Sequence, residues 1–229
     1  MKHATSTGMV RAICVVTVVA VAFGAVANTA QATFDLQVTE IWPGNANGSN
    51  LSEDWFEVTN LGDMPWVAAA DGDLYFDDDS VDETTADLMS GVLQIDPGES
   101  VIFVDDSATT DWANLWGAVV SPLPQIGTYA GAGLGQGGDA VALFMSFGAP
   151  TAGDVIEIET FGDLNGSAGA SWDSFLGELS YVGNASGAVQ TLSFNDENEF
   201  AIGSPGAIPE PASLVLLATS ALCLVRRRR

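Results

Sequence analysis

Residues 34–41, FDLQVTEI, give the clearest indication of the fold. In this stretch the apolar members are Phe34, Leu36 and Val38, and the polar members between them are Asp35, Gln37 and Thr39. A period of two is typical of a β-strand that has one buried face. We therefore expect an extended strand here rather than a helix.

Short runs of the same kind recur along the chain. They are DWFEVTN (54–60), GVLQI (91–95), SVIFV (100–104), DAVALFM (139–145), DVIEIETF (154–161) and GAVQTLSF (187–194). Gly, Pro, Asn or Asp bounds each run, and TTDWANLWGAV (109–119) reads as a brief helical turn. This pattern predicts an all-β fold, an antiparallel β-sandwich. In DWFEVTN, Trp55 and Phe56 are expected on opposite faces of one strand.

The charge distribution excludes several functions. The chain has a formal net charge of −24, and residues 33–207 contain no Lys, Arg, His or Cys. Without basic residues, salt bridges within this body and phosphate contacts to nucleic acid are excluded. Without cysteine there is no disulfide, and without His, Cys or Lys there is no histidine-based triad, thiol nucleophile or Schiff base.

Carboxylates remain as catalytic candidates. Glu53, Asp54 and Glu57, or Asp105 and Asp106, could supply an acid and a base for glycoside hydrolysis. Neighbouring carboxylates on an acidic protein are more often solvated, so we predict that the protein is not an enzyme.

The first 32 residues read as a secretory signal peptide. A short basic region precedes the apolar stretch AICVVTVVAVAFGAVA, and Ala30 and Ala32 provide small residues before the expected cleavage point. We expect the mature chain to begin at about Thr33, after export through the Sec machinery.

The end of the chain carries a second apolar run. Residues 212–225 would form a membrane helix shorter than the roughly 30 Å hydrocarbon core, so we expect only transient anchoring. The terminal Arg226, Arg227, Arg228 and Arg229 would stay on the cytoplasmic side. Pro209 and Pro211 would prevent the helix from extending toward the body.

Residues 208–229, IPEPASLVLLATSALCLVRRRR, resemble the PEP-CTERM sorting signal of Gram-negative bacteria. The resemblance rests on Pro209, Glu210 and Pro211, the short apolar run and the terminal arginines. It implies recognition and cleavage by an exosortase, a membrane protease or transpeptidase. It also implies delivery to the cell surface, the outer envelope or the extracellular matrix.

The body, residues 33–207, resembles the lamin-tail domain, which is an immunoglobulin-like β-sandwich, over about residues 34–162. The positions that carry the resemblance are Glu40, Trp55, Phe56, Glu57, Asn60, Gly62, Pro97, Gly98, Gly133, Leu134, Gly138, Asp139, Val141 and Leu143. The chain departs from the family between residues 63 and 90. There an acidic insertion leaves the strand register undefined.

That acidic stretch is a candidate calcium site. Asp71, Asp73, Asp77 and Asp79 supply the oxygen ligands that calcium prefers, although Phe76 stands where a calcium-loop glycine would be needed. The alternative is a solvated loop that keeps an exported protein soluble.

We therefore predict a structural or binding component of the envelope or exopolysaccharide matrix. The alternative is a carbohydrate-binding or carboxylate-pair glycosidase module acting on exopolysaccharide. Tryptophans could stack on sugars in that case, although core packing explains most of them. The tryptophans considered are Trp42, Trp66, Trp112, Trp116 and Trp172.

Overall fold

Strand β1 (Leu36–Trp42) confirms the first predicted strand and pairs antiparallel with β2 (Trp55–Asn60). The computed structural model describes residues 33–44, 54–105, 109–167, 169–192 and 200–207. These residues are mostly strand and loop, which confirms the all-β prediction. The predicted signal peptide (1–32) and sorting signal (208–229) lie outside the described residues.

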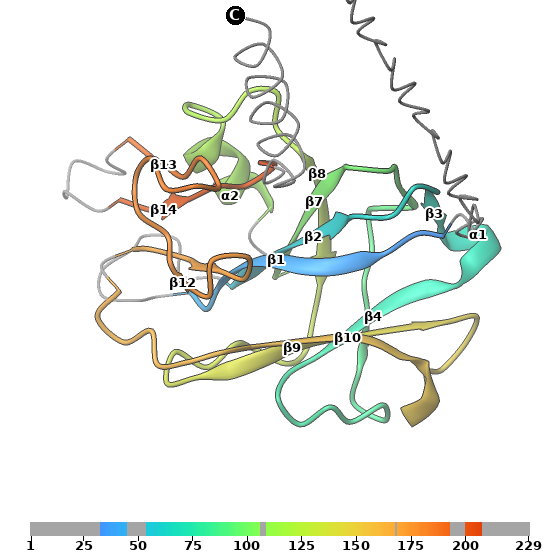
Figure 1. Ribbon diagram of the computed structural model, residues 1–229. Helices are drawn as coiled ribbons and strands as arrows, with labels where there is room; N and C mark the ends of the chain where they lie inside the picture. Colours follow the sequence, from blue (N-terminus) through green and yellow to red (C-terminus); the bar gives the residue numbers. More distant parts are fainter. Residues whose placement is uncertain (1–32, 45–53, 106–108, 168, 193–199, 208–229) are drawn as a thin grey trace, which may run out of the picture. The chain divides into compact units, whose positions relative to one another are not determined.

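Two sheets make up most of the fold (Figure 1). The six-stranded sheet has the order β12 (Glu178–Leu179), β11 (Trp172–Asp173), β1, β2, β7 (Ser100–Asp105), β8 (Gln125–Tyr129). The four-stranded sheet has the order β10 (Val155–Phe161), β9 (Asp139–Ser146), β4 (Asp73–Asp77), β5 (Asp87–Leu88).

Smaller elements complete the chain. Two-stranded sheets join β13 (Val189–Gln190) to β14 (Ile202–Gly203) and β3 (Trp66–Val67) to β6 (Gln94–Ile95). The helices are α1 (Ala68–Asp71), α2 (Thr109–Trp116) and the 3-10 helix η1 (Ala152–Asp154). Helix α2 falls within the stretch predicted to be helical, and it extends over two turns.

Aromatic rings fill the space between the two main sheets. Phe56 of β2 lies 5.0 Å from Phe76 of β4 and 5.9 Å from Phe103 of β7, measured between ring centroids. Tyr129 of β8 lies 4.5 Å from Phe76. Leu and Val side chains of both sheets surround these rings and are buried with them. The sheets therefore share one apolar core, as in a β-sandwich.

The opposite face of the six-stranded sheet is covered as well. Trp55 points away from Phe56, as predicted, and packs edge-on against Trp112 and Trp116 of α2, each at 5.9 Å between ring centroids. In Figure 1, α2, β13 and β14 lie on one side of β1 and β2, and β9 and β10 lie on the other. Both faces of β2 are therefore buried.

A β-bulge in β1 changes which residues face the core. Val38 pairs with Val58, but Glu40 rather than Thr39 pairs with Glu57, so the register shifts by one residue. Strict alternation would have turned Glu40 toward the sandwich core. Because of the bulge, Ile41 enters that core and Glu40 faces the tryptophan side.

Two predictions are corrected by the structure. The sandwich is not fully antiparallel, because β7 and β8 run parallel. Parallel neighbours need a long crossover connection, and the chain that contains α2 provides it. The acidic stretch between residues 63 and 90 is also not merely an inserted loop, because it contains β4, which pairs with β9 and buries Leu74 and Phe76.

Candidate functional site

Three carboxylates lie side by side across the six-stranded sheet. Glu40 of β1 is the register partner of Glu57 on β2 and of Asp173 on β11. All three side chains are buried, with no more than 1% of their surface exposed. We call these three residues the carboxylate row. Because residues 33–207 have no Lys, Arg or His, no cationic side chain of the described body neutralises the row.

The chain that leads to the sorting signal covers this row. We call residues 200–206, FAIGSPG, the C-terminal segment. Its β14 pairs with β13, and the carbonyl of Ile202 accepts a hydrogen bond from the Ser171 amide at 2.9 Å. Ser204 and Pro205 are buried. The segment is therefore part of the folded body and not a free linker.

Glu40 binds this segment through its backbone. The Ser204 amide donates to both carboxyl oxygens of Glu40, at 2.9 and 3.1 Å. The Ser171 hydroxyl also contacts the Oε1 atom of Glu40. Gly203 passes so close that a Cβ atom there would lie 2.3 Å from the same oxygen. Only glycine allows the backbone to approach the carboxyl group in this way.

Glu57 makes the second contact with the segment. The Gly206 amide donates to its Oε2 atom, and the Thr39 hydroxyl donates to its Oε1 atom at 2.6 Å. A chain of hydroxyl groups continues from Thr39 to Thr59 at 2.9 Å and from Thr59 to Ser100 at 2.7 Å. The polar atoms of Glu57 are thus hydrogen-bonded although the side chain is fully buried.

Burial dominates the ionisation of both glutamates. Desolvation raises the pKa of Glu40 well above its ordinary value, and the neighbouring Glu57 raises it further. Desolvation also raises the pKa of Glu57, to about 7, although hydrogen bonds from Thr39 and Gly206 oppose the shift. Ionising two facing buried carboxylates with no cationic side chain beside them is costly, so burial favours the protonated forms of Glu40 and Glu57.

The four predicted calcium ligands do not form one site. Asp71 ends α1 and Asp73 begins β4, whereas Asp77 ends β4 and Asp79 follows it; a strand of this length separates Asp73 from Asp77 by about 13 Å. Asp71 accepts a hydrogen bond from the Val67 amide at 2.8 Å. In the part of the chain that the structure describes, no group of three or more His, Cys, Asp or Glu residues is arranged to hold a metal ion.

Asp77 instead organises the turn that follows β4. It is buried and accepts hydrogen bonds from the Ser80 hydroxyl and the Asp82 amide, both at 2.6 Å. The Asp79 amide donates to Asp139 at 3.1 Å, which ties this turn to the start of β9. The sequence showed the acidic stretch, but Asp77, its buried member, stabilises the turn that follows β4.

The candidate catalytic carboxylates are only partly described. Glu53 and Asp106 lie outside the described residues. Asp54 accepts a hydrogen bond from the Leu134 amide at 2.5 Å, and Glu57 belongs to the carboxylate row. Glu57 is fully buried under the C-terminal segment, so it does not face a substrate cleft in this arrangement.

The suggestion that tryptophans form sugar-stacking platforms is wrong for four of the five residues considered. Trp42, Trp66, Trp112 and Trp116 are at most 1% exposed and pack in the interior. Trp172 is half-buried, and its indole N–H donates to Glu159 at 3.1 Å. Core packing therefore explains these side chains, because a stacking platform needs an exposed ring face.

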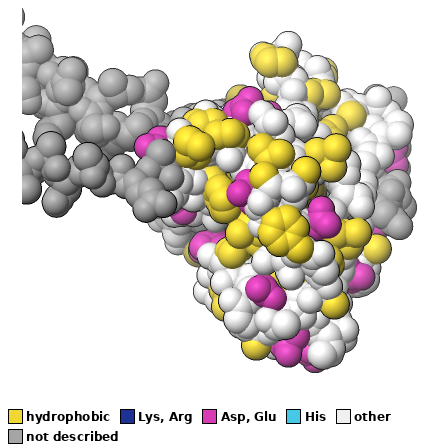
Figure 2. All heavy atoms as spheres, turned by 90° about the vertical axis from the view of Figure 1, so that its right-hand side faces the viewer, with side chains coloured by type: hydrophobic (Ala, Val, Ile, Leu, Met, Phe, Trp, Pro, Cys, Tyr) yellow, Lys and Arg dark blue, Asp and Glu magenta, His cyan; other side chains and the backbone are white. Residues whose placement is uncertain are grey.

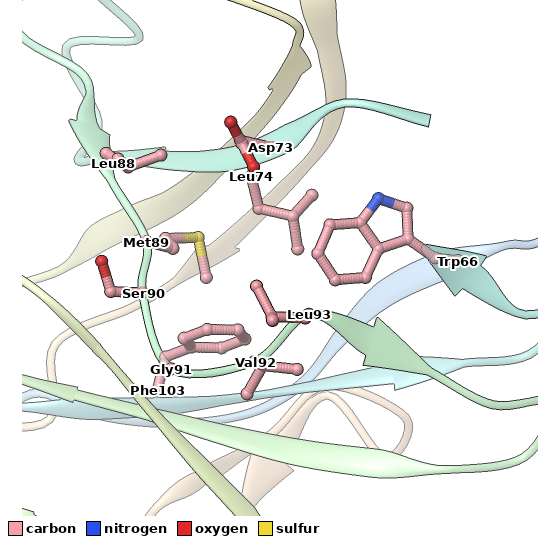
Figure 3. Close-up of a pocket in the computed structure, with 10 residues that line it drawn as sticks. All are labelled: Trp66, Asp73, Leu74, Leu88, Met89, Ser90, Gly91, Val92, Leu93 and Phe103. Atoms are coloured by element: carbon pink, nitrogen blue, oxygen red, sulfur yellow. The ribbon is translucent and has the colours of Figure 1, made fainter. Parts of the chain in front are cut away.

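An apolar cavity of about 180 Å³ opens near the start of β4. Figure 3 shows the Trp66 ring on one side, with Leu74, Met89 and Leu93 directed toward the middle. Leu93 is 71% exposed at the rim. On the face shown in Figure 2, apolar side chains lie among scattered acidic ones. Asp73 is the charged residue among those that line the cavity, and the other lining residues are apolar except for Ser90 and Gly91.

Sequence reasoning had singled out Glu40 as a position of the family resemblance, and Glu57 both as such a position and as a candidate catalytic carboxylate. It missed Asp173 and the C-terminal segment as their partners. One signal was available, because a glutamate next to two strongly apolar residues in EIW (40–42) is unusual for an exposed position. Glu40 and Ser204 lie far apart in the sequence, so no local pattern indicates that they are partners.

Comparison with known proteins supports the prediction made from the C-terminus. The family model of the PEP-CTERM protein-sorting motif matches residues 207–229, so the chain carries the signal of an exported, exosortase-processed surface protein. No curated protein and no solved structure shows a significant match to the chain. Within the described residues, no helix has the length and apolar character needed to cross a membrane.

Proposed function

We propose that this protein is a non-catalytic β-sandwich, exported through the Sec machinery and released by an exosortase at its Pro209-Glu210-Pro211 motif. It would then act as a structural or binding component of the outer envelope or exopolysaccharide matrix of a Gram-negative bacterium. The observation that carries the proposal is the sorting motif matched at residues 207–229.

The position of the motif relative to the folded body supports processing. The match begins at residue 207, directly after Gly206, whose amide is hydrogen-bonded to Glu57. The Ala207 amide, at the first matched residue, donates to the Ser204 carbonyl at 2.9 Å and lies two residues before Pro209. Cleavage near the Pro-Glu-Pro motif would leave every described contact of the body in place.

The chemistry of the body supports a structural rather than a catalytic role. Residues 33–207 lack His, Cys and Lys, and Glu57 is buried and hydrogen-bonded. The four buried tryptophans disfavour the alternative of a sugar-binding module that uses them as platforms.

A lamin-tail-like, immunoglobulin-like domain remains our proposal for the fold family. Its motif residues have structural roles here, which supports the resemblance. Asn60 donates to the carbonyls of Met64 and Ile95, at 2.8 and 3.0 Å. Gly98 has a positive φ of 73° in the turn before β7, and its amide donates to the Asn60 carbonyl at 2.8 Å.

The test compares the full-length chain in an exosortase-containing bacterium and in a matched strain without the exosortase. We expect the surface-exposed protein to lose its C-terminal mass from about the Pro-Glu-Pro motif onward only in the first strain. Replacing Pro209, Glu210 and Pro211 together by alanine should abolish the loss, whereas the exposed-site control Glu178→Gln should not. Equal processing in both strains would overturn the proposal.

The matrix role needs a separate measurement. Processed protein from the first strain is mixed with exopolysaccharide purified from the same culture, and the bound fraction is measured by sedimentation. Retention well above that of an unrelated protein of similar acidity supports a matrix role. No excess retention would restrict the proposal to an envelope component.

A further inference from the structure

We propose that the C-terminal segment, residues 200–206, is a latch whose closure on the body depends on protons held by the Glu40–Glu57 pair. This inference concerns the folded body and does not rest on the proposed export route. Its consequence is a pH-dependent distance between the body and the chain that follows Gly206.

The first argument is the hydrogen-bond inventory of Glu40. The Ser171 hydroxyl lies within reach of Glu40, of the Ser180 hydroxyl at 3.0 Å and of the Ile202 carbonyl at 3.1 Å, but it carries one hydrogen. If Glu40 is protonated, it donates to Ser171, and the hydrogen of Ser171 is free for the Ile202 carbonyl. Protonation thus adds a bond to the segment.

The second argument is the charge around the pair. The titratable group that faces Glu40 from β11 is Asp173, which is another carboxylate. The elements packed on the row contribute hydroxyl groups and backbone amides, and residues 200–206 contain no titratable side chain. Ionisation of the pair therefore places like charges beneath the segment, where hydrogen bonds from Ser204, Gly206 and Thr39 oppose the cost but no cationic side chain of residues 33–207 neutralises the charge.

The third argument is that the glutamates hold the end of the segment, whereas Ala201 and Ile202 are hydrogen-bonded separately to Thr191, Gly169 and Ser171. Ser204 and Gly206 each direct an amide to a glutamate, and β14 is only two residues long. Opening the segment would expose Glu40 and Glu57 to water, where they ionise at ordinary values. Higher pH must then favour the open form, because the open form binds fewer protons.

Opening would change the reach of the sorting signal. With Gly206 held, Pro209 can lie at most about 10 Å from it, the reach of a fully extended chain of that length. With the whole segment released, the reach from Phe200 rises to about 30 Å.

The experiment is hydrogen–deuterium exchange of the full-length chain at several pH values, with rates corrected for the intrinsic pH dependence. Peptides covering 200–207 report the segment, and peptides covering β9 report the core. We expect lower protection in the segment than in β9 at every pH. We also expect segment protection to fall at least about tenfold between about pH 5 and pH 7.

Matched variants test whether the Glu40–Glu57 pair causes the pH-dependent fall in protection of the segment. The double variant Glu40→Gln and Glu57→Gln keeps the size and hydrogen-bonding shape of the protonated pair, so its segment protection should change little with pH after correction. Glu157→Gln removes a half-buried carboxylate on β10 and should retain the wild-type fall. Equal protection of segment and β9, a flat wild-type profile, or an unchanged fall in the double variant would each overturn the latch.

Discussion

One face of the six-stranded sheet packs on the four-stranded sheet, and the other is covered by α2 and the C-terminal segment. The first face is apolar, with Phe56, Phe76 and Phe103 in contact. The second combines buried tryptophans with the carboxylate row. Apolar burial stabilises the first face at any pH. The stability of the second face depends on whether Glu40 and Glu57 are protonated.

The largest expected effect comes from breaking the apolar face. Phe56→Ala removes a fully buried ring that contacts three other aromatic rings. We expect a loss of about 3–5 kcal/mol of unfolding free energy, measured by chemical denaturation. A loss below about 1 kcal/mol would mean that the two sheets do not share this core.

The pH dependence of stability tests the second face. The pKa of Glu57 rises from 4.5 to about 7 on folding, so its contribution is fully present below about pH 4.5 and is lost as pH rises through about 7. We expect about 3 kcal/mol less unfolding free energy at pH 8 than at pH 4.5 from this group. Glu40 shifts in the same direction and adds to the loss.

Denaturation of the double variant Glu40→Gln and Glu57→Gln at both pH values is the check. Its stability should differ much less between them than that of the wild type. A pH dependence as steep as that of the wild type would assign the effect to other carboxylates.

The next largest effect tests the close approach of Gly203 to the carboxyl group of Glu40. Gly203→Ala places a Cβ 2.3 Å from the carboxyl oxygen of Glu40 and 3.2 Å from the Trp116 ring. We expect a loss of about 1–3 kcal/mol, measured by thermal unfolding, because both neighbours are buried. Gly148→Ala is the control, since a Cβ there meets nothing within 4 Å. Equal effects of the two changes would contradict the close approach.

The smallest effect concerns a carboxylate outside both interiors. Burial, Glu159 and Asp35 raise the pKa of Glu157 on β10, but much of the side chain remains in contact with water. We expect Glu157→Gln to change the unfolding free energy by less than about 0.5 kcal/mol. A change as large as that caused by Glu40→Gln together with Glu57→Gln would mean that the number of carboxylates, rather than their burial, controls the unfolding free energy.

The sequence by itself determined the all-β class, the opposite faces of Trp55 and Phe56, and the sorting motif at the C-terminus. Each is a local pattern, because alternation and motif spacing are properties of consecutive residues. The sequence did not predict the strand role of residues 73–77. Aspartates at both ends of that short strand concealed the buried Leu74 and Phe76.

Only the tertiary structure decided that Glu40, Glu57 and Asp173 form a row and that residues 200–206 cover it. A one-residue bulge at Thr39 reverses the orientation that alternation predicts for Glu40. Ser204 and Gly206 then reach the row from more than 140 positions away along the chain. Strand pairing and burial set these contacts, and neither is encoded in the spacing of neighbouring residues.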